Sequence, residues 1–210
     1  TREGQDLLAR LGGPLSALHR AVYAEPAEAV QTLQIATLAS IAKAWLLPRL
    51  PDFRRRHPQI ALLLQTDYAL SRPPPRMAMV AIRHGQRPSE ELHSELLFED
   101  RLVVVATPAL ARQLGRDPQR WPAGQWLQHL SLDGRVWFDA AGLAPGFEPA
   151  GPAFNDADVL LDAAGQGLGL ALTRLSIAWP RLRSGALVLA CSTVCRSPRD
   201  NLLVLRKDSA

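Results

Sequence analysis

Short apolar runs alternate with segments of helical apolar spacing along most of this 210-residue chain. Residues 60–64 form a continuous apolar run, which is typical of a parallel strand covered on both faces, and residues 102–106 predict a further strand. Between them, apolar side chains from Ile41 to Phe53 recur at helical spacing, and the segment ends before Pro58. Repeated strand–helix–strand units of this kind predict an α/β fold whose sheets are mostly parallel.

The expected elements follow one another in a regular order. Ser40 is predicted to cap the helix expected over residues 41–57, and Asn155 or Asp156 to cap the helix expected over residues 156–163. Their side-chain oxygens can accept hydrogen bonds from the free amide groups at a helix start. Pro48 and Pro51 predict irregular early turns in the first helix. The expected strands lie at residues 33–37, 60–64, 79–82, 102–106, 130–132, 136–138, 170–172, 186–190 and 202–205. The expected helices lie at residues 41–57, 108–114, 156–163 and 174–183.

The first 25 residues form a separate unit. An apolar stripe at steps of three and four residues predicts a helix over residues 3–25, and the Gly-Gly-Pro at 12–14 predicts a kink or a break in it. A leucine face of this kind needs a partner, which is either the rest of the domain or another chain. Residues 25–28 are interpreted as a linker. The stripe consists of Leu7, Leu11, Leu15, Leu18 and Val22.

Composition and charge limit the class of protein. The content of 47% hydrophobic residues is enough for a substantial core. No apolar run approaches the roughly 20 residues that span a bilayer, and the chain does not start like a signal peptide, so we expect a cytoplasmic protein without membrane contact. The net charge of +4 comes mainly from dispersed arginines, and their densest cluster, at residues 54–56, ends a helix where cations favour the dipole. Cys191 and Cys195 are expected as reduced thiols rather than as a redox pair.

Motifs for catalysis, metal binding or cofactor binding are not found in the sequence. Residues 165–169 are rich in glycine, but they follow an expected helix and precede an expected strand, which is the reverse of a dinucleotide-binding loop. The five histidines lack metal-ligand spacing, and no arrangement indicates a catalytic triad. We therefore expect no catalytic residues, no metal and no cofactor.

Five segments match the order and spacing of motifs in one known bacterial family. They are residues 1–4 with the striped helix that follows, and residues 45–58, 81–85, 154–172 and 182–188. Taken together, these segments resemble the LysR-type transcriptional regulators. The first resembles the end of the family's winged helix-turn-helix with its linker helix, and the others resemble motifs of its C-terminal effector-binding (regulatory) domain.

The resemblance implies a two-lobed, periplasmic-binding-protein-like (type 2) α/β fold, preceded by part of a linker helix. Two crossovers, near residues 99–101 and 189–193, would join the lobes. The implied boundaries are residues 1–25 for the linker-helix remnant, 32–100 and 190–210 for lobe I, and 101–189 for lobe II.

The sequence departs from the family's pattern in three places. Met79 stands where the family usually has Asp, and the three prolines of residues 71–75 replace a short helix. Because prolines are excluded from helix interiors, we expect a rebuilt loop there, with altered access for the effector. The family's terminal helix after the last strand is also missing, so we expect a segment that is cut at both ends.

The resemblance also implies that a small effector binds between the lobes. Open α/β sheets bind ligands beyond the carboxyl ends of their strands, where helix N-termini supply free amides and partial positive charge. Arg83 can hold a carboxylate with a two-pronged hydrogen bond, so we expect an anionic effector. Each candidate hydroxyl or amide taken alone is better explained as a cap or a turn. The candidate effector-binding residues are Thr37, Ser40, Thr66, Arg83, His84, Phe154 and Asn155.

Three hypotheses for the function follow. In the first, the chain is the sensor of a regulator that forms a homodimer or homotetramer and contacts DNA only through an N-terminal helix-turn-helix outside this segment. The second is a solute-binding protein of a transporter, which shares the two-lobed design but is disfavoured by the striped helix and the lack of an export signal. The third, an enzyme on a related scaffold, is disfavoured because no catalytic set is found.

Overall fold

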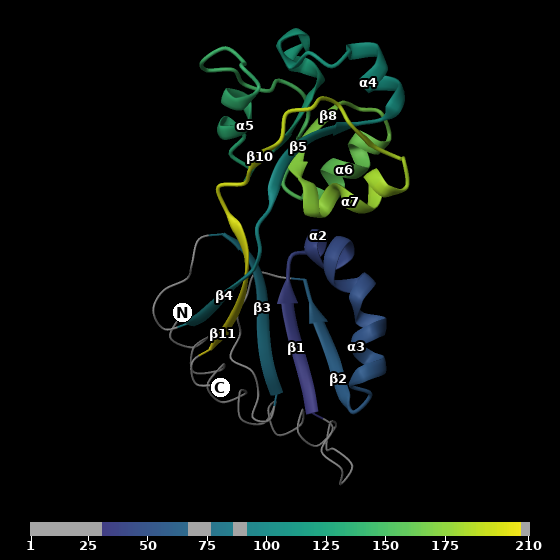
Figure 1. The fold of residues 1–210 in the computed structure, drawn as a ribbon, viewed down its shortest axis with the longest axis vertical. Helices are drawn as coiled ribbons and strands as arrows, with labels where there is room; N and C mark the ends of the chain where they lie inside the picture. The colour runs from purple at the N-terminus through teal and green to yellow at the C-terminus, as the bar shows by residue number, and fades with distance from the viewer. Residues whose placement is uncertain (1–30, 67–76, 86–91, 207–210) are drawn as a thin grey trace, which may run out of the picture.

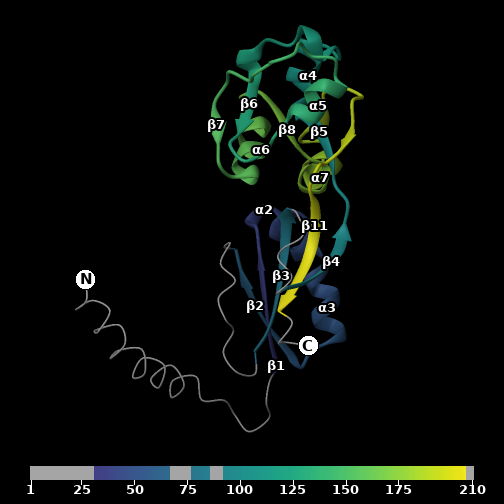
Figure 2. The ribbon, with the colours of Figure 1, turned by 90° about the vertical axis from the view of Figure 1, so that its left-hand side faces the viewer.

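The chain is organised as two lobes stacked along its long axis, each built around its own sheet (Figures 1 and 2). This is a computed structural model, and it describes residues 31–66, 77–85 and 92–206. The expected N-terminal helix with its leucine stripe and the proline loop at 71–75 lie outside the described residues. No described helix is long and apolar enough to cross a membrane.

Lobe I contains a five-stranded sheet in the order β2-β1-β3-β11-β4. The strand pairs β1·β2 and β1·β3 are parallel, whereas β11 runs antiparallel to both β3 and β4. The connection from β1 to β2 is helical from Ala39 to Arg56, but its winding changes from α to π to 3-10 and back to α. The irregular turns predicted around Pro48 and Pro51 are therefore confirmed. The elements are β1 (Gln31–Thr37), α2 (Ala39–Ile41), η1 (Ala42–Leu46), η2 (Leu47–Arg49), α3 (Leu50–Arg56), β2 (Ile60–Gln65), β3 (Met77–Gly85), β4 (Leu92–Phe98) and β11 (Asp200–Arg206).

Two features of lobe I differ from expectation. Strand β2 lies at the edge of the sheet and alternates between exposed and half-buried positions, with Leu63 42% exposed. The prediction that residues 60–64 form a strand buried on both faces was therefore wrong. The edge strand β4 was not predicted, because its sequence Leu-His-Ser-Glu-Leu-Leu-Phe mixes polar and apolar residues without a strict period.

Lobe II contains a six-stranded sheet in the order β10-β5-β8-β6-β7, with β9 also paired to β5. Strand β8 is antiparallel to β5 and parallel to β6, and it is buried along its whole length. The sheets of both lobes are therefore mixed, and the expectation of mostly parallel sheets was wrong. The strands are β5 (Arg101–Ala106), β6 (Trp126–His129), β7 (Ala153–Phe154), β8 (Leu170–Arg174), β9 (Val188–Leu189) and β10 (Cys195–Arg196). The helices are α4 (Pro108–Leu114), η3 (Pro118–Arg120), η4 (Ala123–Gln125), α5 (Arg135–Ala140), α6 (Ala157–Gly165) and α7 (Leu175–Arg183).

The expected strands at 130–132 and 136–138 are wrong. The strand is β6, which ends at His129, and residues 135–140 form helix α5. Valine, tryptophan and phenylalanine favour strands, but here the rings are placed by packing. Trp137 and Phe138 both contact the buried ring of Trp126, at 5.7 Å between ring centroids in each case. Tertiary contacts thus override the local strand preference of this segment.

Two crossovers join the lobes, and one lies later than expected. The first passes through Glu99 and Asp100, within the predicted range of 99–101. The second was expected at 189–193, but β10 (Cys195–Arg196) still pairs with β5 of lobe II. The chain therefore returns to lobe I through residues 197–199, and residues 190–196 belong with lobe II. Cys191 and Cys195, beside this return, are free thiols.

The turn that precedes β8 needs glycine at two positions. Gly167 has a φ of +81°, which other residues adopt only with strain. A Cβ added to Gly169 would lie 2.4 Å from the carbonyl oxygen of Gln125, so this glycine permits a close approach of two backbones. The glycines of residues 165–169 therefore join α6 to β8, in agreement with the helix-to-strand interpretation of this segment.

Candidate functional site: a cleft between the lobes

A cavity of about 170 Å³ lies between the two lobes, beyond the carboxyl ends of strands β1 and β8. Lobe I contributes the turn from β1 into α2 and the end of β3. Lobe II contributes the ends of β6 and β8 and the start of α6, and the second crossover closes one side. The position agrees with the general rule that α/β proteins bind ligands where strand ends and helix starts converge.

The lobe I wall is the first turn of the helix that follows β1. Helix α2 begins at Ala39 with Leu38 as N-cap, and no side chain caps it, so the prediction that Ser40 is the cap was wrong. Ser40 instead lies inside the first turn, 3% exposed, and lines the cavity. The amide groups at a helix start lack partners within the helix, and here they lie at the cleft.

On the lobe II wall, the start of α6 is capped by a side chain. Oδ1 of Asp156 accepts from the backbone N–H groups of Asp158, at 2.8 Å, and Val159, at 3.0 Å. Of the two predicted candidates, Asp156 is therefore the cap, whereas Asn155 is exposed at the cavity and available to a ligand.

Replacing Asp156 by alanine should destabilise the chain by about 1 kcal/mol, because two amide groups of α6 lose their acceptor. Urea unfolding measures this change. Asp156→Asn should restore most of the loss, since an asparagine oxygen also caps helices. An unchanged unfolding midpoint for Asp156→Ala would contradict the assigned cap.

Arg174 is the buried cation of the cleft. It ends strand β8, is 5% exposed, lines the cavity, and donates from Nη1 to Oδ1 of Asn201 at 3.5 Å. Asn201 in turn donates to Asp100 at 3.1 Å, so the guanidinium is linked through β11 to the first crossover. Asp100 also accepts from the backbone N–H of Ser176, at 3.1 Å, in the first turn of α7. Its burial and this hydrogen bond restrict the movement of the guanidinium relative to that of a surface arginine.

Two histidines face the same cavity in their neutral form. Burial, assisted by the charge of Arg174, lowers the pKa of His84 from its ordinary value to about 4. Burial and Arg174 also lower the pKa of His129. At neutral pH the imidazoles therefore contribute hydrogen-bonding groups but no charge. The positive charge at the cavity comes from Arg174 and Arg199, opposite Asp133 and Asp156.

Several buried polar atoms next to the cleft have no hydrogen-bond partner among the described residues. They are Oγ1 of Thr173 and Nδ1 of His84, which belong to residues lining the cavity, and Oγ1 of Thr37. Thr37 lines an adjoining cavity of about 100 Å³ that shares Leu38 and His84 with the first. An unpartnered buried polar group is costly, so these atoms point to a ligand or ordered water that completes the site.

The seven predicted site residues separate into three groups. Ser40, His84 and Asn155 line the interlobe cavity. Thr37 and Arg83 line the adjoining cavity, together with His84.

Two of the predicted residues lie elsewhere in the structure. Thr66 is exposed just after β2, and Phe154 packs against the lobe II core, and neither lines these two cavities. Sequence reasoning missed Arg174, although it stands in the same relation to β8 and α7 as Thr37 does to β1 and α2, at the polar end of an apolar strand before a helix.

A family model, the LysR substrate binding domain, matches residues 26–210. The chain belongs to this family. The transcriptional activator AmpR of Pseudomonas aeruginosa is 33% identical over 82% of this chain and 59% of its own length. AmpR of Citrobacter koseri is 35% identical over 57% of this chain and 42% of its own length. The chain thus spans roughly half of these curated relatives, which are transcriptional regulators and not enzymes.

Solved structures place the LysR chain in the expected fold. The effector domain of AmpR from Pseudomonas aeruginosa superposes with a TM-score of 0.72 at 28% identity, covering 84% of this chain and 86% of that one. The AmpR effector-binding domain from Citrobacter freundii gives a TM-score of 0.71 at 20% identity, covering 86% and 90% of the two chains. The predicted two-lobed, type 2 periplasmic-binding-protein-like fold is confirmed. The family match supports an effector-binding domain of LysR-type regulators and does not favour a transporter's solute-binding protein.

Proposed function

We propose that this domain senses a small anionic effector, which binds between the lobes, within a LysR-type transcriptional regulator. The observation that carries the proposal is the buried guanidinium of Arg174 at the interlobe cavity. A fixed, desolvated guanidinium binds carboxylate or phosphate oxygens in a two-pronged geometry. The cavity of about 170 Å³ suits a small ligand.

The surrounding groups support an anion that also carries neutral polar atoms. The uncapped start of α2 offers amide donors and the partial positive charge of a helix end. Ser40, Asn155 and the unpartnered hydroxyl of Thr173 offer further hydrogen bonds. Of the residues predicted from sequence, Ser40, His84 and Asn155 remain in the proposed site, with Thr37 and Arg83 in the adjoining cavity.

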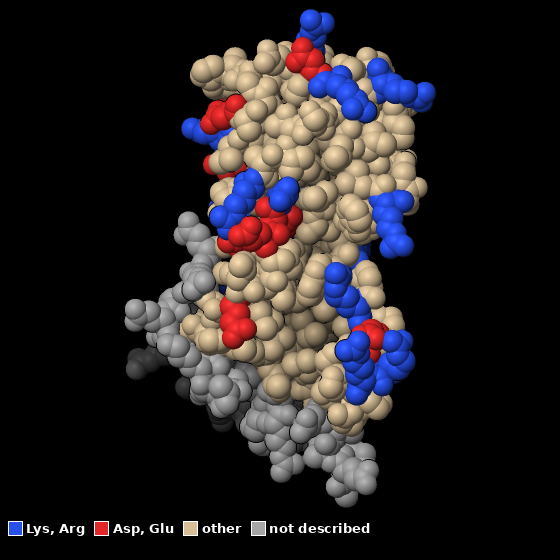
Figure 3. Space-filling model, viewed as in Figure 1, with Lys and Arg blue, Asp and Glu red and all other residues tan. Residues whose placement is uncertain are grey.

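A ligand held by both lobes shifts the balance between open and closed arrangements, because it binds the closed arrangement better. In the full-length protein, this shift would reposition a helix-turn-helix that contacts DNA, within a homodimer or homotetramer. The relatives named above are called helix-turn-helix activators. On the face shown in Figure 3, basic side chains are dispersed and several lie beside acidic ones, as Arg55 and Arg56 lie beside Asp52. This pattern favours DNA contact outside the described residues.

A thermal-shift screen with carboxylates, phosphates, amines and neutral sugars tests the proposal, with calorimetry on the hits. Small anions should raise the unfolding temperature, since a ligand at about 100 times its Kd stabilises the folded state by about 2.7 kcal/mol. Arg112→Gln, which alters an exposed arginine on α4, serves as the control and should keep every hit. Hits confined to amines or sugars would contradict the anionic effector.

A further inference from the structure

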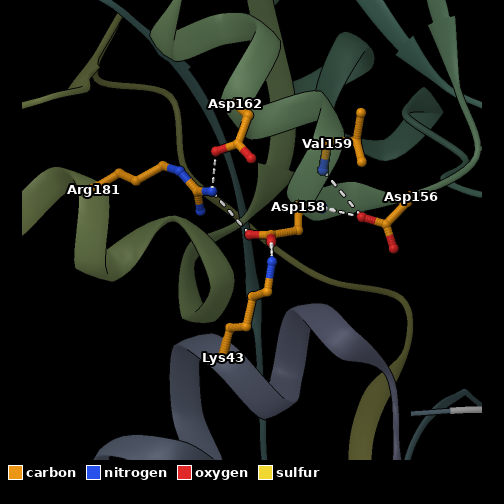
Figure 4. A network of polar contacts seen from close by, with 6 residues as sticks. All are labelled: Lys43, Asp156, Asp158, Val159, Asp162 and Arg181. Atoms are coloured by element: carbon orange, nitrogen blue, oxygen red, sulfur yellow. Dashed lines mark hydrogen bonds and ion pairs between the residues drawn. The ribbon is translucent and has the colours of Figure 1, made fainter.

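A charged network outside the cleft connects the two lobes (Figure 4). Nζ of Lys43, on η1 of lobe I, donates to Oδ2 of Asp158, on α6 of lobe II. Oδ1 of the same carboxylate accepts from Arg181 of α7 at 2.9 Å, and Arg181 also pairs with Asp162. One carboxylate of lobe II is therefore shared between a partner in its own lobe and a partner in the other.

An apolar contact between the lobes lies beside this network. Ala44, the neighbour of Lys43, packs against the lobe II core cluster that includes Leu160 and Ile177. The side chain of Asp158 is only 7% exposed, whereas that of Lys43 is 63% exposed. Lys43 thus reaches from solvent to a carboxylate that lies largely beneath the lobe contact.

We propose that the Lys43–Asp158 ion pair is a reversible latch that stabilises the closed arrangement of the lobes and makes that arrangement sensitive to ionic strength. The latch lies close to the cleft on both sides. Ser40 lines the cavity three residues before Lys43, and Ala157 lines it immediately before Asp158. The helical segment after β1 therefore lines the cleft through Ser40 and supplies Lys43 to the latch. In the same way, the start of α6 lines the cleft through Ala157 and supplies Asp158 to the latch. The latch itself does not depend on the identity of the effector.

The network also explains why the latch can open. Burial alone would raise the pKa of Asp158, but the hydrogen bonds from Lys43 and Arg181 outweigh it and hold the pKa below its ordinary value. The carboxylate is therefore ionised at neutral pH. When the lobes separate, Asp158 keeps Arg181 and its favourable place in the first turn of α6, and Lys43 becomes hydrated. Opening leaves no buried charge without a partner, which is the costly outcome for a buried ion pair.

Lys43→Met tests the latch, because it keeps the length of the side chain and removes its charge. Small-angle X-ray scattering and amide hydrogen exchange on the chain without ligand should show a larger radius of gyration and faster exchange in η1 and the first turn of α6. Exchange should accelerate roughly twofold to fivefold, as expected for a partly exposed ion pair. Raising salt to about 0.5 M should have the same effect on the wild type and little on the variant, because salt screens the pair.

Two controls make the outcome decisive. Lys43→Arg should behave as the wild type because it keeps the charge. Arg120→Met removes an ion pair with Asp117 that lies within lobe II, at 3.2 Å, and should leave the scattering and the exchange of η1 unchanged. Wild-type scattering and exchange in Lys43→Met, or an equal response to salt in both proteins, would overturn the latch. Because no ligand is used, this result is independent of whether the proposed effector class is correct.

Discussion

Replacing Arg174 by glutamine should nearly abolish the binding of anionic effectors to this domain. The variant keeps a shorter polar side chain at the end of β8 and removes the buried charge at the cavity. Truncating one partner of a buried, hydrogen-bonded charge pair costs about 2–5 kcal/mol, which corresponds to a loss of affinity by a factor of about 30 to a few thousand. Calorimetric titration with the anions that the screen identifies measures the change.

A second variant, at Arg83, distinguishes the anion site at Arg174 from the site at Arg83 that the sequence predicted. Arg83 lines only the adjoining, smaller cavity, so Arg83→Gln should weaken binding far less than Arg174→Gln. Arg174→Lys should recover part of the affinity, because it restores a charge without the two-pronged geometry. The unfolding temperature of each variant must stay near that of the wild type for the comparison to hold. Equal losses for the two glutamine variants would mean that the anion spans both cavities.

Sequence patterns predicted the fold wherever burial and local chemistry agreed. Strands β5 and β8 are buried along nearly their whole length, and their apolar runs predicted them within one or two residues. The start of α6 was predicted because Asp156 is both a strong capping residue and the actual cap. The failures lie where longer-range contacts decide the structure. Helix α5 forms around a cluster of aromatic rings, and β10 is a two-residue strand specified only by its pairing with β5.

The cleft could be predicted only as a region. The rule that ligands bind at strand ends pointed to the region between the lobes, where Ser40, His84 and Asn155 line the candidate cavity. It could not rank the cations, because burial, and not residue type, distinguishes Arg174 from the other arginines. The latch was equally hidden, since Lys43 and Asp158 are 115 residues apart and meet only through the packing of the lobes.

The stability of this domain should fall as the pH drops from about 7 to about 5, and His84 should account for much of the loss. The pKa of His84 is about 4 in the folded chain, below the ordinary value of 6.5 that it regains on unfolding. Between these values the unfolded chain binds a proton that the folded chain does not, so acid favours unfolding. The contribution over this pH interval is roughly 2 kcal/mol. His129, whose pKa is also lowered, adds to the loss in the same direction.

Urea unfolding at the two pH values tests this linkage. His84→Gln should remove most of the loss, whereas His57→Gln, at an exposed position after α3, should leave it unchanged. A loss as steep in His84→Gln as in the wild type would contradict the assignment.

The pKa of His84 should also respond to ligand binding in the cleft. An anion bound beside it would offset the charge of Arg174, which helps to lower the pKa of His84, and would therefore raise that pKa. Saturation with an anionic effector should accordingly flatten the pH dependence, and binding should take up protons in this range. Calorimetry in buffers of different ionisation enthalpy measures that uptake directly.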